Sequence, residues 1–338
     1  MSLTMIGGVK IPIVGLGTWQ ATNEEELEAA VEAALETGYR HIDTASAYQN
    51  EHVIGKVLNK WLTSGKLKRE DIFITTKLPM THIHPDLVET ALKESLQKLQ
   101  LDYVDLYLVH SPIYMKFVEA GKPMEPLPTD HLAVWKKMEE QVDAKRTRTI
   151  GLSNFNVNQI DRIVKNCRIQ PANTQVELHV YYQQKKLRDY CKKHNIVVVS
   201  YGSLGSPGLN VFMKRLGKEV QIPSLLADPV VTKIAEKHNK ATSHVLLRYL
   251  TQNDIVVIPK SVKPERVKQN FNFLDFTLDA EDLKALEALD KDVDGRLFRM
   301  DVFNPKIKNT QSIHTKVISM TKKKPRKTVR RLVVSSCL

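Results

Sequence analysis

Four residues whose side chains can donate, accept or stabilise a proton lie in the first third of the chain: Asp43, Tyr48, Lys77 and His110. A phenol becomes a better proton donor beside an ammonium group, because positive charge stabilises the phenolate. A buried ammonium in turn needs a carboxylate to keep its proton. An imidazole can hydrogen-bond an oxygen and orient it. This set of groups could therefore act together as one proton relay.

Each of these residues alone has an ordinary structural explanation, such as a surface aspartate or a tyrosine with a satisfied hydroxyl. Their spacing favours a shared site. Asp43 follows the apolar run 40–42, Lys77 follows 72–76 and His110 follows 104–109. Polar groups that recur at the ends of successive strands indicate chemistry at one face of a fold.

Short apolar strands alternate with helical segments along most of the chain. We expect strands at 14–18, 40–42, 72–76, 104–109, 149–152, 173–177, 196–200 and 255–258. Helices are expected near 23–37, 51 onward, 85–99, 131–142, 157–165, 184–194, 228–239, 243–252, 264–272 and 279–289. Gly38 can end the first helix, because glycine adopts the left-handed cap conformation cheaply. A hairpin over residues 4–14, turned by Gly7-Gly8, precedes the first strand.

Runs that are apolar on both faces are typical of buried parallel strands. The alternation therefore predicts an α/β fold, a (β/α)8 TIM barrel with an N-terminal β-hairpin and extra C-terminal helices. An open doubly wound sheet is the alternative, but the turn at Gly15-Leu-Gly-Thr-Trp lacks the third glycine of the dinucleotide-binding motif. In the barrel, one face collects the strand-end residues Thr18, Asp43, Lys77, His110, Ser153, Gln175, Tyr201 and Lys260.

The composition is that of an ordinary globular protein, with 42% hydrophobic and 26% charged residues. We expect neither a signal peptide nor a transmembrane segment, because no apolar stretch approaches the length needed to cross a bilayer. The three cysteines, Cys167, Cys191 and Cys337, have no C-x-x-C spacing, which argues against a disulfide framework or a metal site. These features predict a cytoplasmic protein.

The net charge of +12 is concentrated in the C-terminal tail. Residues 305–338 contain ten Lys and Arg and no Asp or Glu, which leaves about +2 for residues 1–304. We therefore expect two parts, a catalytic barrel over 1–304 and a basic, disordered tail over 305–338. The run Lys322-Lys-Lys-Pro-Arg-Lys327 resembles a nuclear localisation sequence or a polyanion-binding patch.

The segments 38–48, 106–112, 151–155 and 258–270 resemble the signatures of the aldo-keto reductase superfamily, in matching order and spacing. This resemblance, to aldose reductase-like and carbonyl- or ecdysteroid-reductase-like members, covers roughly residues 4–304. It implies that the protein is an NADPH-dependent reductase of aldehydes and ketones. It also implies that Tyr48 is the catalytic acid and that Lys77, Asp43 and His110 support it.

The resemblance further implies a set of cofactor-binding residues. Ser153, Asn154 and Gln175 match residues that hold the nicotinamide carboxamide, and Tyr201 matches the ring that stacks on it. The loop of Ser203, Leu204 and Ser206 matches the pyrophosphate clamp. The adenosine 2′-phosphate site is expected at Lys260, Ser261, Val262, Arg266, Gln269 and Asn270, with Thr18 and Trp19 completing the cofactor cleft.

The substrate pocket is expected to be lined by Trp19, Tyr48, His110, Phe117 and Phe298. Pro79 and Ser111 stand where several relatives have tryptophan, which indicates a wide mouth. The sequence leaves open a bulky carbonyl, such as a steroid, an ecdysteroid or a prostanoid, and general aldehydes.

We expect a monomer whose partner is a small carbonyl compound. Two other functions compete with catalysis. One is a regulatory, NADPH-binding subunit on the same fold, and the other is binding of nucleic acid or an anionic surface by the tail.

Overall fold

The computed structural model describes residues 1–116, 124–215, 217 and 221–298. Its centre is an eight-stranded parallel sheet in the order β12-β11-β10-β9-β6-β5-β4-β3. Bridges between Val14 and Val257 and between Gly17 and Lys260 join the two ends of this order in parallel. The sheet therefore closes on itself as the predicted barrel. Its strands are β3 (Leu16–Gly17), β4 (His41–Asp43), β5 (Phe73–Leu78), β6 (Val104–Val109), β9 (Thr147–Ser153), β10 (Asn173–Glu177), β11 (Val197–Tyr201) and β12 (Ile255–Val257).

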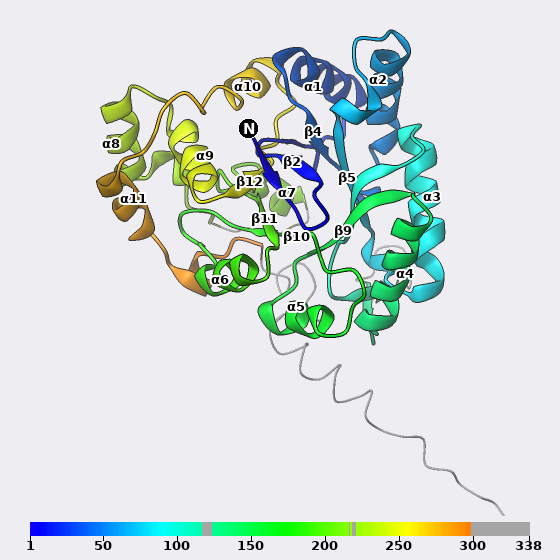
Figure 1. The fold of residues 1–338 in the computed structure, drawn as a ribbon. Coiled ribbons are helices and arrows are strands. Elements are labelled where there is room, and N and C mark those ends of the chain that lie inside the picture. Colours follow the sequence, from blue (N-terminus) through cyan, green and yellow to red (C-terminus); the bar gives the residue numbers. More distant parts are fainter. Residues whose placement is uncertain (117–123, 216, 218–220, 299–338) are drawn as a thin grey trace, which may run out of the picture.

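Helices surround the barrel, and the antiparallel hairpin of β1 (Ser2–Thr4) and β2 (Lys10–Pro12) lies across the middle of the face turned to the viewer (Figure 1). The helices are α1 (Glu24–Thr37), α2 (Glu51–Thr63), α3 (Val88–Leu99), α4 (His131–Asp143), α5 (Val157–Val164), α6 (Lys185–Lys193), α7 (Leu209–Arg215), α8 (Pro229–His238), α9 (Thr242–Gln252), α10 (Pro264–Gln269) and α11 (Ala280–Glu287). No helix in the described ranges is long and apolar enough to span a membrane.

The helix ends follow the sequence signals. The Asn23 side chain accepts a hydrogen bond from the Glu26 amide at the start of α1, and three glutamates occupy the first turn. Gly38 ends the helix with a φ of 108°, a left-handed value that a residue with a Cβ tolerates poorly. These two caps confirm the predicted bounds of α1 and place β4 directly after it.

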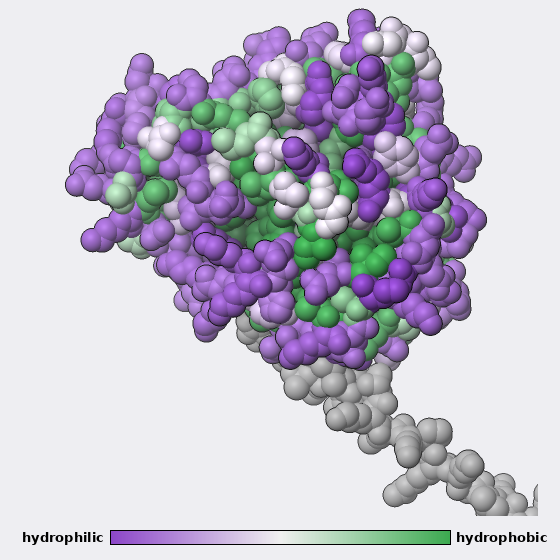
Figure 2. All heavy atoms as spheres, viewed as in Figure 1, coloured by the Kyte–Doolittle hydropathy of each residue, from purple (hydrophilic) through white to green (hydrophobic). Residues whose placement is uncertain are grey.

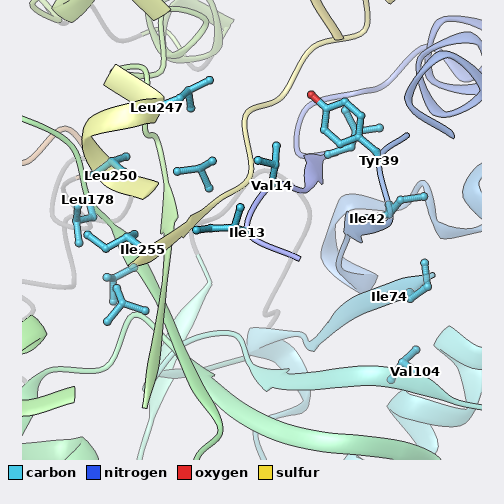
Figure 3. Close-up of a cluster of buried hydrophobic side chains, with 14 of the residues drawn as sticks. Ile13, Val14, Tyr39, Ile42, Ile74, Val104, Leu178, Leu247, Leu250 and Ile255 are labelled. Carbon is cyan, nitrogen blue, oxygen red and sulfur yellow. The ribbon is translucent and has the colours of Figure 1, made fainter. Parts of the chain in front are cut away.

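Two layers of apolar side chains explain why the strands are apolar on both faces. The outer layer packs the sheet against the helices and includes Ile42, Ile74 and Ile255 (Figure 3). The inner layer fills the barrel, where Leu106 and Val199 of the strands meet Met5 and Ile11 of the hairpin region. Burial on both faces is the physical reason that a period of two is missing from these strands.

Polar side chains cover the outer helices, and apolar ones show in the central part of the face around the hairpin (Figure 2). Within the described ranges, the large hydrophobic side chains classed as exposed are Met1, Val211 and Val293.

Several element bounds differ from the predictions. Lys77, Asp43, Ser153 and Tyr201 belong to their strands instead of following them, because the parallel ladder continues through these residues. A second hairpin, β7 (Tyr114–Lys116) and β8 (Glu125–Leu127), was not expected in the proline-rich loop. Pro126 is part of this hairpin, which is consistent with the tolerance of short edge strands for proline. Helix α7 was also missed, and α10 ends three residues before its predicted bound.

Candidate active site

A fully buried lysine is the centre of the site. The Nζ atom of Lys77 in β5 donates to Asp43 Oδ1 at 2.6 Å, to the Thr44 carbonyl at 2.8 Å and to the Tyr48 hydroxyl at 3.2 Å. Asp43 ends β4, and Tyr48 ends a short 3₁₀ helix, η1 (Ser46–Tyr48). The ammonium thus uses all three of its donors, one of them on the phenol.

The loop that carries Tyr48 is fixed by buried hydrogen bonds. The Asn50 side chain donates to the carbonyls of Thr18 at 2.9 Å and Ala21 at 3.2 Å, and accepts from Thr44 Oγ1 at 3.2 Å. Glu51, the first residue of α2, accepts from Thr76 Oγ1 at 2.6 Å. These bonds tie the Tyr48 loop to β3, β4 and β5, so the phenol has little freedom to turn away from Lys77. The sequence reasoning missed the positioning role of Asn50 and Glu51.

The charges of this cluster are set by burial and by mutual contact. Burial raises the pKa of Tyr48, while Lys77 opposes this shift, and the net result is a raised pKa. The net lowering expected from an adjacent ammonium is therefore absent, because loss of water outweighs the attraction. Burial lowers the pKa of Lys77, but Asp43 and Tyr48 more than compensate and leave it raised. The phenol is consequently protonated beside a charged ammonium.

His110 completes the cluster from the end of β6. Its ring meets that of Tyr48 edge-on, with centroids 5.7 Å apart. Burial, with a smaller contribution from Lys77, lowers the pKa of His110 to about 3. The imidazole is therefore neutral near pH 7 and has one N–H to donate. Its Nδ1 atom is buried without a hydrogen-bond partner in the described part of the chain.

The predicted nicotinamide residues lie on the adjoining strands. Gln175 Nε2 donates to Asp43 Oδ2 at 2.7 Å, so β10 is tied to the lysine cluster. Asn154 has a left-handed φ of 66° and donates from Nδ2 to the His110 carbonyl at 2.8 Å and to Ser153 Oγ at 3.1 Å. The Tyr201 hydroxyl donates to Asn154 Oδ1 at 2.7 Å. The four residues predicted to bind nicotinamide thus form one hydrogen-bond network with the cluster around Lys77.

The loop after β11 has the backbone expected of a tight turn. Gly202, Gly205 and Ser206 have φ values of 68°, 77° and 46°. The hydroxyl of Ser203 lies 2.7 Å from that of Ser200 and is buried. Leu204 packs against the outer apolar layer. The Ser203 side chain is therefore engaged within the loop, a detail that the sequence did not indicate.

The segment after β12 borders a cavity of about 570 Å³, lined in part by Glu26, Val262, Lys263, Arg266 and Gln269. Lys260 lies at the closure of the barrel, where its Nζ donates to the Gln20 carbonyl at 3.3 Å, and burial lowers its pKa. The Ser261 hydroxyl accepts a hydrogen bond from the Lys263 amide at 3.1 Å, within its own turn. Asn270 is buried, at 8% exposure. Three predicted residues, Val262, Arg266 and Gln269, therefore share one cavity.

The aromatic side of the site is formed by residues far apart in sequence. The ring of Trp19 lies 5.5 Å from that of Phe298, which lies 5.4 Å from that of Tyr201. Phe212 of α7, which we had not predicted, also contacts Trp19, at 5.5 Å. Phe117 lies outside the described residues, and so does the tail over 305–338.

Residues 13–291 match the profile of the aldo/keto reductase family. The chain belongs to this family. It is 41% identical to dihydrodiol dehydrogenase 3 of Bos taurus over 294 residues, covering 84% of this chain and 89% of that protein. It is 42% identical to aldo-keto reductase family 1 member A1 of Xenopus tropicalis over 295 residues, with 85% and 88% covered.

A solved structure of the aldose reductase from Schistosoma japonicum has the same fold as this aldo/keto reductase. The two superpose with a TM-score of 0.80 at 39% identity, covering 90% of this chain and 96% of the other. The match confirms the barrel. Family membership makes the protein an oxidoreductase that acts on carbonyl groups, of the class that uses NADP(H).

Proposed function

We propose that the protein reduces aldehydes and ketones to alcohols with NADPH, with Tyr48 as the proton donor. One observation supports this most: a fully buried Lys77 ammonium hydrogen-bonds both the Asp43 carboxylate and the Tyr48 hydroxyl. A buried ion pair of this kind costs desolvation free energy, so a phenol hydrogen-bonded to the buried ammonium is poorly explained by stability alone.

NADPH, when bound, would supply the hydride, and the residues of the chain would manage the proton. Tyr48 holds its proton at neutral pH and would donate it to the developing alkoxide. Lys77 would stabilise the phenolate that remains, and Asp43 keeps Lys77 charged. The neutral His110 would donate a hydrogen bond to the carbonyl oxygen and orient it toward Tyr48. General acid catalysis of this type contributes about 10²- to 10⁴-fold.

The residues that line the rest of the cleft fit a dinucleotide. We assign Ser153, Asn154, Gln175 and Tyr201 to the nicotinamide, with Thr18 and Trp19 beside it. The turn of Ser203, Leu204 and Ser206 would face the pyrophosphate. The cavity near Arg266 and Gln269 supports an adenosine 2′-phosphate site that also includes Lys260, Ser261, Val262 and Asn270. A planar guanidinium and an ammonium are suited to a dianionic phosphate.

The substrate pocket would be lined by Trp19, Tyr48, His110, Phe117 and Phe298. We propose a bulky apolar carbonyl compound as substrate, because Trp19, Tyr201 and Phe298 form an aromatic wall. Prostaglandin F synthase 1 of Bos taurus, 40% identical over 306 residues, has a name consistent with such a substrate. We further propose that residues 1–304 are a catalytic monomer and that 305–338 are an appendage.

The test is NADPH oxidation, followed by absorbance, with propanal, 2-naphthaldehyde and a steroid ketone. We expect turnover with both aldehydes and little turnover when NADH replaces NADPH at equal concentration. Tight NADPH binding without oxidation by any of the three compounds would instead favour a regulatory subunit on the same fold.

A further inference from the structure

Glu177, the last residue of β10, binds a segment of chain that lies about 120 residues further along. Its Oε1 accepts a hydrogen bond from the Leu297 amide at 2.6 Å, and its Oε2 accepts one from the Phe298 amide at 3.0 Å. The side chain is buried, with 2% of the residue exposed. A carboxylate that receives two consecutive backbone amides fixes both the position and the direction of the chain there.

Two neighbours reinforce this contact. His179 Nε2 lies 3.1 Å from Glu177 Oε1, and Arg296 Nε lies 3.9 Å from Oε2. The chain just before the segment is also held, because the Lys291 amide donates to the Tyr181 carbonyl at 2.9 Å. A Cβ on Gly295 would overlap that same carbonyl. Residues 295–298 are therefore fixed to the barrel at two points, of which Glu177 is the one nearest Phe298.

The position of Phe298 decides the shape of the aromatic wall. Its ring touches Trp19 on one side and Tyr201 on the other. Gly202 lies beside both residues, since a Cβ there would be in ordinary van der Waals contact with Phe298 Cε2 at 3.5 Å and Glu177 Cγ at 3.9 Å. Moving the Phe298 amide away from Glu177 would move the ring and open this wall.

We propose that Glu177 is a positioning residue for substrate size: it holds Phe298 in place and so determines how well a bulky carbonyl compound is bound. Among the described residues, Glu177 makes no hydrogen bond to the proton-donating cluster of Asp43, Tyr48, Lys77 and His110. This proposal rests on the proposed carbonyl reduction for its kinetic readout, but its structural readout is independent of catalysis.

The chain offers a closely matched control in Glu139 of α4. Its Oε1 accepts from the consecutive amides of Arg168 at 2.7 Å and Ile169 at 2.8 Å, and Arg168 Nε lies 3.8 Å from Oε2. Glu139 is also buried, at 6% exposure. It joins α4 to the segment before β10, whereas Glu177 joins the end of β10 to the site.

The kinetic experiment compares Glu177→Gln, Glu139→Gln and the wild type with propanal and 2-naphthaldehyde. Glutamine keeps the shape but replaces one acceptor oxygen with a donor, so Glu177→Gln loses one of the two hydrogen bonds from the Leu297 and Phe298 amides. Glu139 accepts both of its amides on Oε1, so Glu139→Gln removes a buried charge and leaves an oxygen for both amides. We expect Glu177→Gln to raise KM for 2-naphthaldehyde by about tenfold, with kcat for propanal within about twofold. Glu139→Gln should leave the ratio of the two KM values unchanged. Equal changes for both substrates in Glu177→Gln would overturn the proposal.

A double-mutant cycle with Phe298→Ala tests whether Glu177 acts through that ring. In the Phe298→Ala background, Glu177→Gln should have almost no further effect on KM for 2-naphthaldehyde, because the two changes remove one wall. Additive effects of the two substitutions would mean that Glu177 acts elsewhere, and the proposal would fail.

Limited trypsin cleavage between Arg296 and Leu297 supplies the readout that needs no activity. Glu177 holds the Leu297 amide of this bond, so Glu177→Gln should be cleaved there at least about fivefold faster, with Glu139→Gln at the wild-type rate. Equal rates in all three proteins would overturn the anchoring even if carbonyl reduction is confirmed. If Glu177→Gln is cleaved faster but the wild-type protein reduces no carbonyl compound, the anchoring is supported and the proposed function is refuted. If Glu177→Gln does not fold, Glu177→Asp is subject to the same outcomes.

Discussion

Two buried aspartates at opposite ends of the barrel strands have different cationic partners. Asp105, near the start of β6, accepts from Arg69 Nη2 at 2.8 Å, Arg148 Nη1 at 2.9 Å and the Ile74 amide at 2.9 Å. Asp43, at the end of β4, accepts from Lys77 at 2.6 Å and Gln175 at 2.7 Å. The first aspartate is held by side chains that never lose a proton, and the second by one that shares its donors with a phenol.

The difference supports our proposal that the strand starts serve stability and the strand ends serve the reaction. Arg69 and Arg148 both bind Asp105 near the starts of the strands. There a permanent positive charge in a fixed position is all that the aspartate needs from its partners. Lys77 places a compact charge against Tyr48 and gives that phenol a stabilised conjugate base. This arrangement matches the rule that barrels react at the C-terminal strand ends and are held together at the other end.

The largest effect is expected from Tyr48→Phe, which removes the proton donor and keeps the ring. Carbonyl reduction should fall by about 10²- to 10⁴-fold, while the Kd for NADPH stays within about threefold. Steady-state rates and a fluorescence titration with NADPH measure the two quantities. Retention of more than half of the wild-type turnover would show that Tyr48 is not the acid.

Asp105→Asn is the matching change at the other end of the strands. It removes a buried charge from two arginines and should lower the free energy of unfolding by about 2–4 kcal/mol. Denaturant unfolding measures this loss, and kcat at a temperature where the variant is folded should stay within about twofold. A large loss of kcat with normal stability would contradict the division between the two ends.

Arg266→Ala tests the proposed 2′-phosphate site of the cofactor. Loss of a charge-assisted contact to the 2′-phosphate should weaken NADPH binding by roughly ten- to a hundredfold and leave NADH almost unchanged. Both cofactors are titrated at one salt concentration, because ionic strength screens exposed charges. Equal losses for both would assign Arg266 to the adenine or to the fold.

The smallest effect is expected from deletion of residues 306–338. A cationic segment with little apolar area has little with which to dock, so aldehyde activity should stay within about threefold. The thermal transition should move by only a few degrees. Activity that collapses on deletion would show that the tail completes the pocket.

The barrel and the grouping of the proposed catalytic residues at one face could be predicted from the sequence, because strand patterns and strand-end positions depend on local order. Asp43, Lys77 and His110 could be found this way, since each follows or ends an apolar run. Glu177 could not, because its proposed role depends on a contact with Phe298 at a separation of 121 residues. The hydrogen bond between Tyr201 and Asn154, likewise, joins the ends of β11 and β9, which lie on either side of β10, and depends on a left-handed turn.

The direction of the pKa shift of Tyr48 also could not be predicted from the sequence. A lysine beside a tyrosine indicates a lowered phenol pKa, but the degree of burial decides the net direction. Burial is a property of the packed barrel and of the loop fixed by Asn50, neither of which can be derived from the two residue types alone.

Transfer of deuterium from NADPH that carries deuterium at both C4 positions of the nicotinamide tests the central proposal most directly. The wild-type protein is mixed with 2-naphthaldehyde and stoichiometric labelled NADPH in ordinary water, and the alcohol is analysed by mass spectrometry and NMR. We predict one deuterium on the carbinol carbon and an unlabelled hydroxyl, with the same product formed far more slowly by Tyr48→Phe. An alcohol without the label, or no alcohol from a protein that binds NADPH, would contradict hydride transfer at this site.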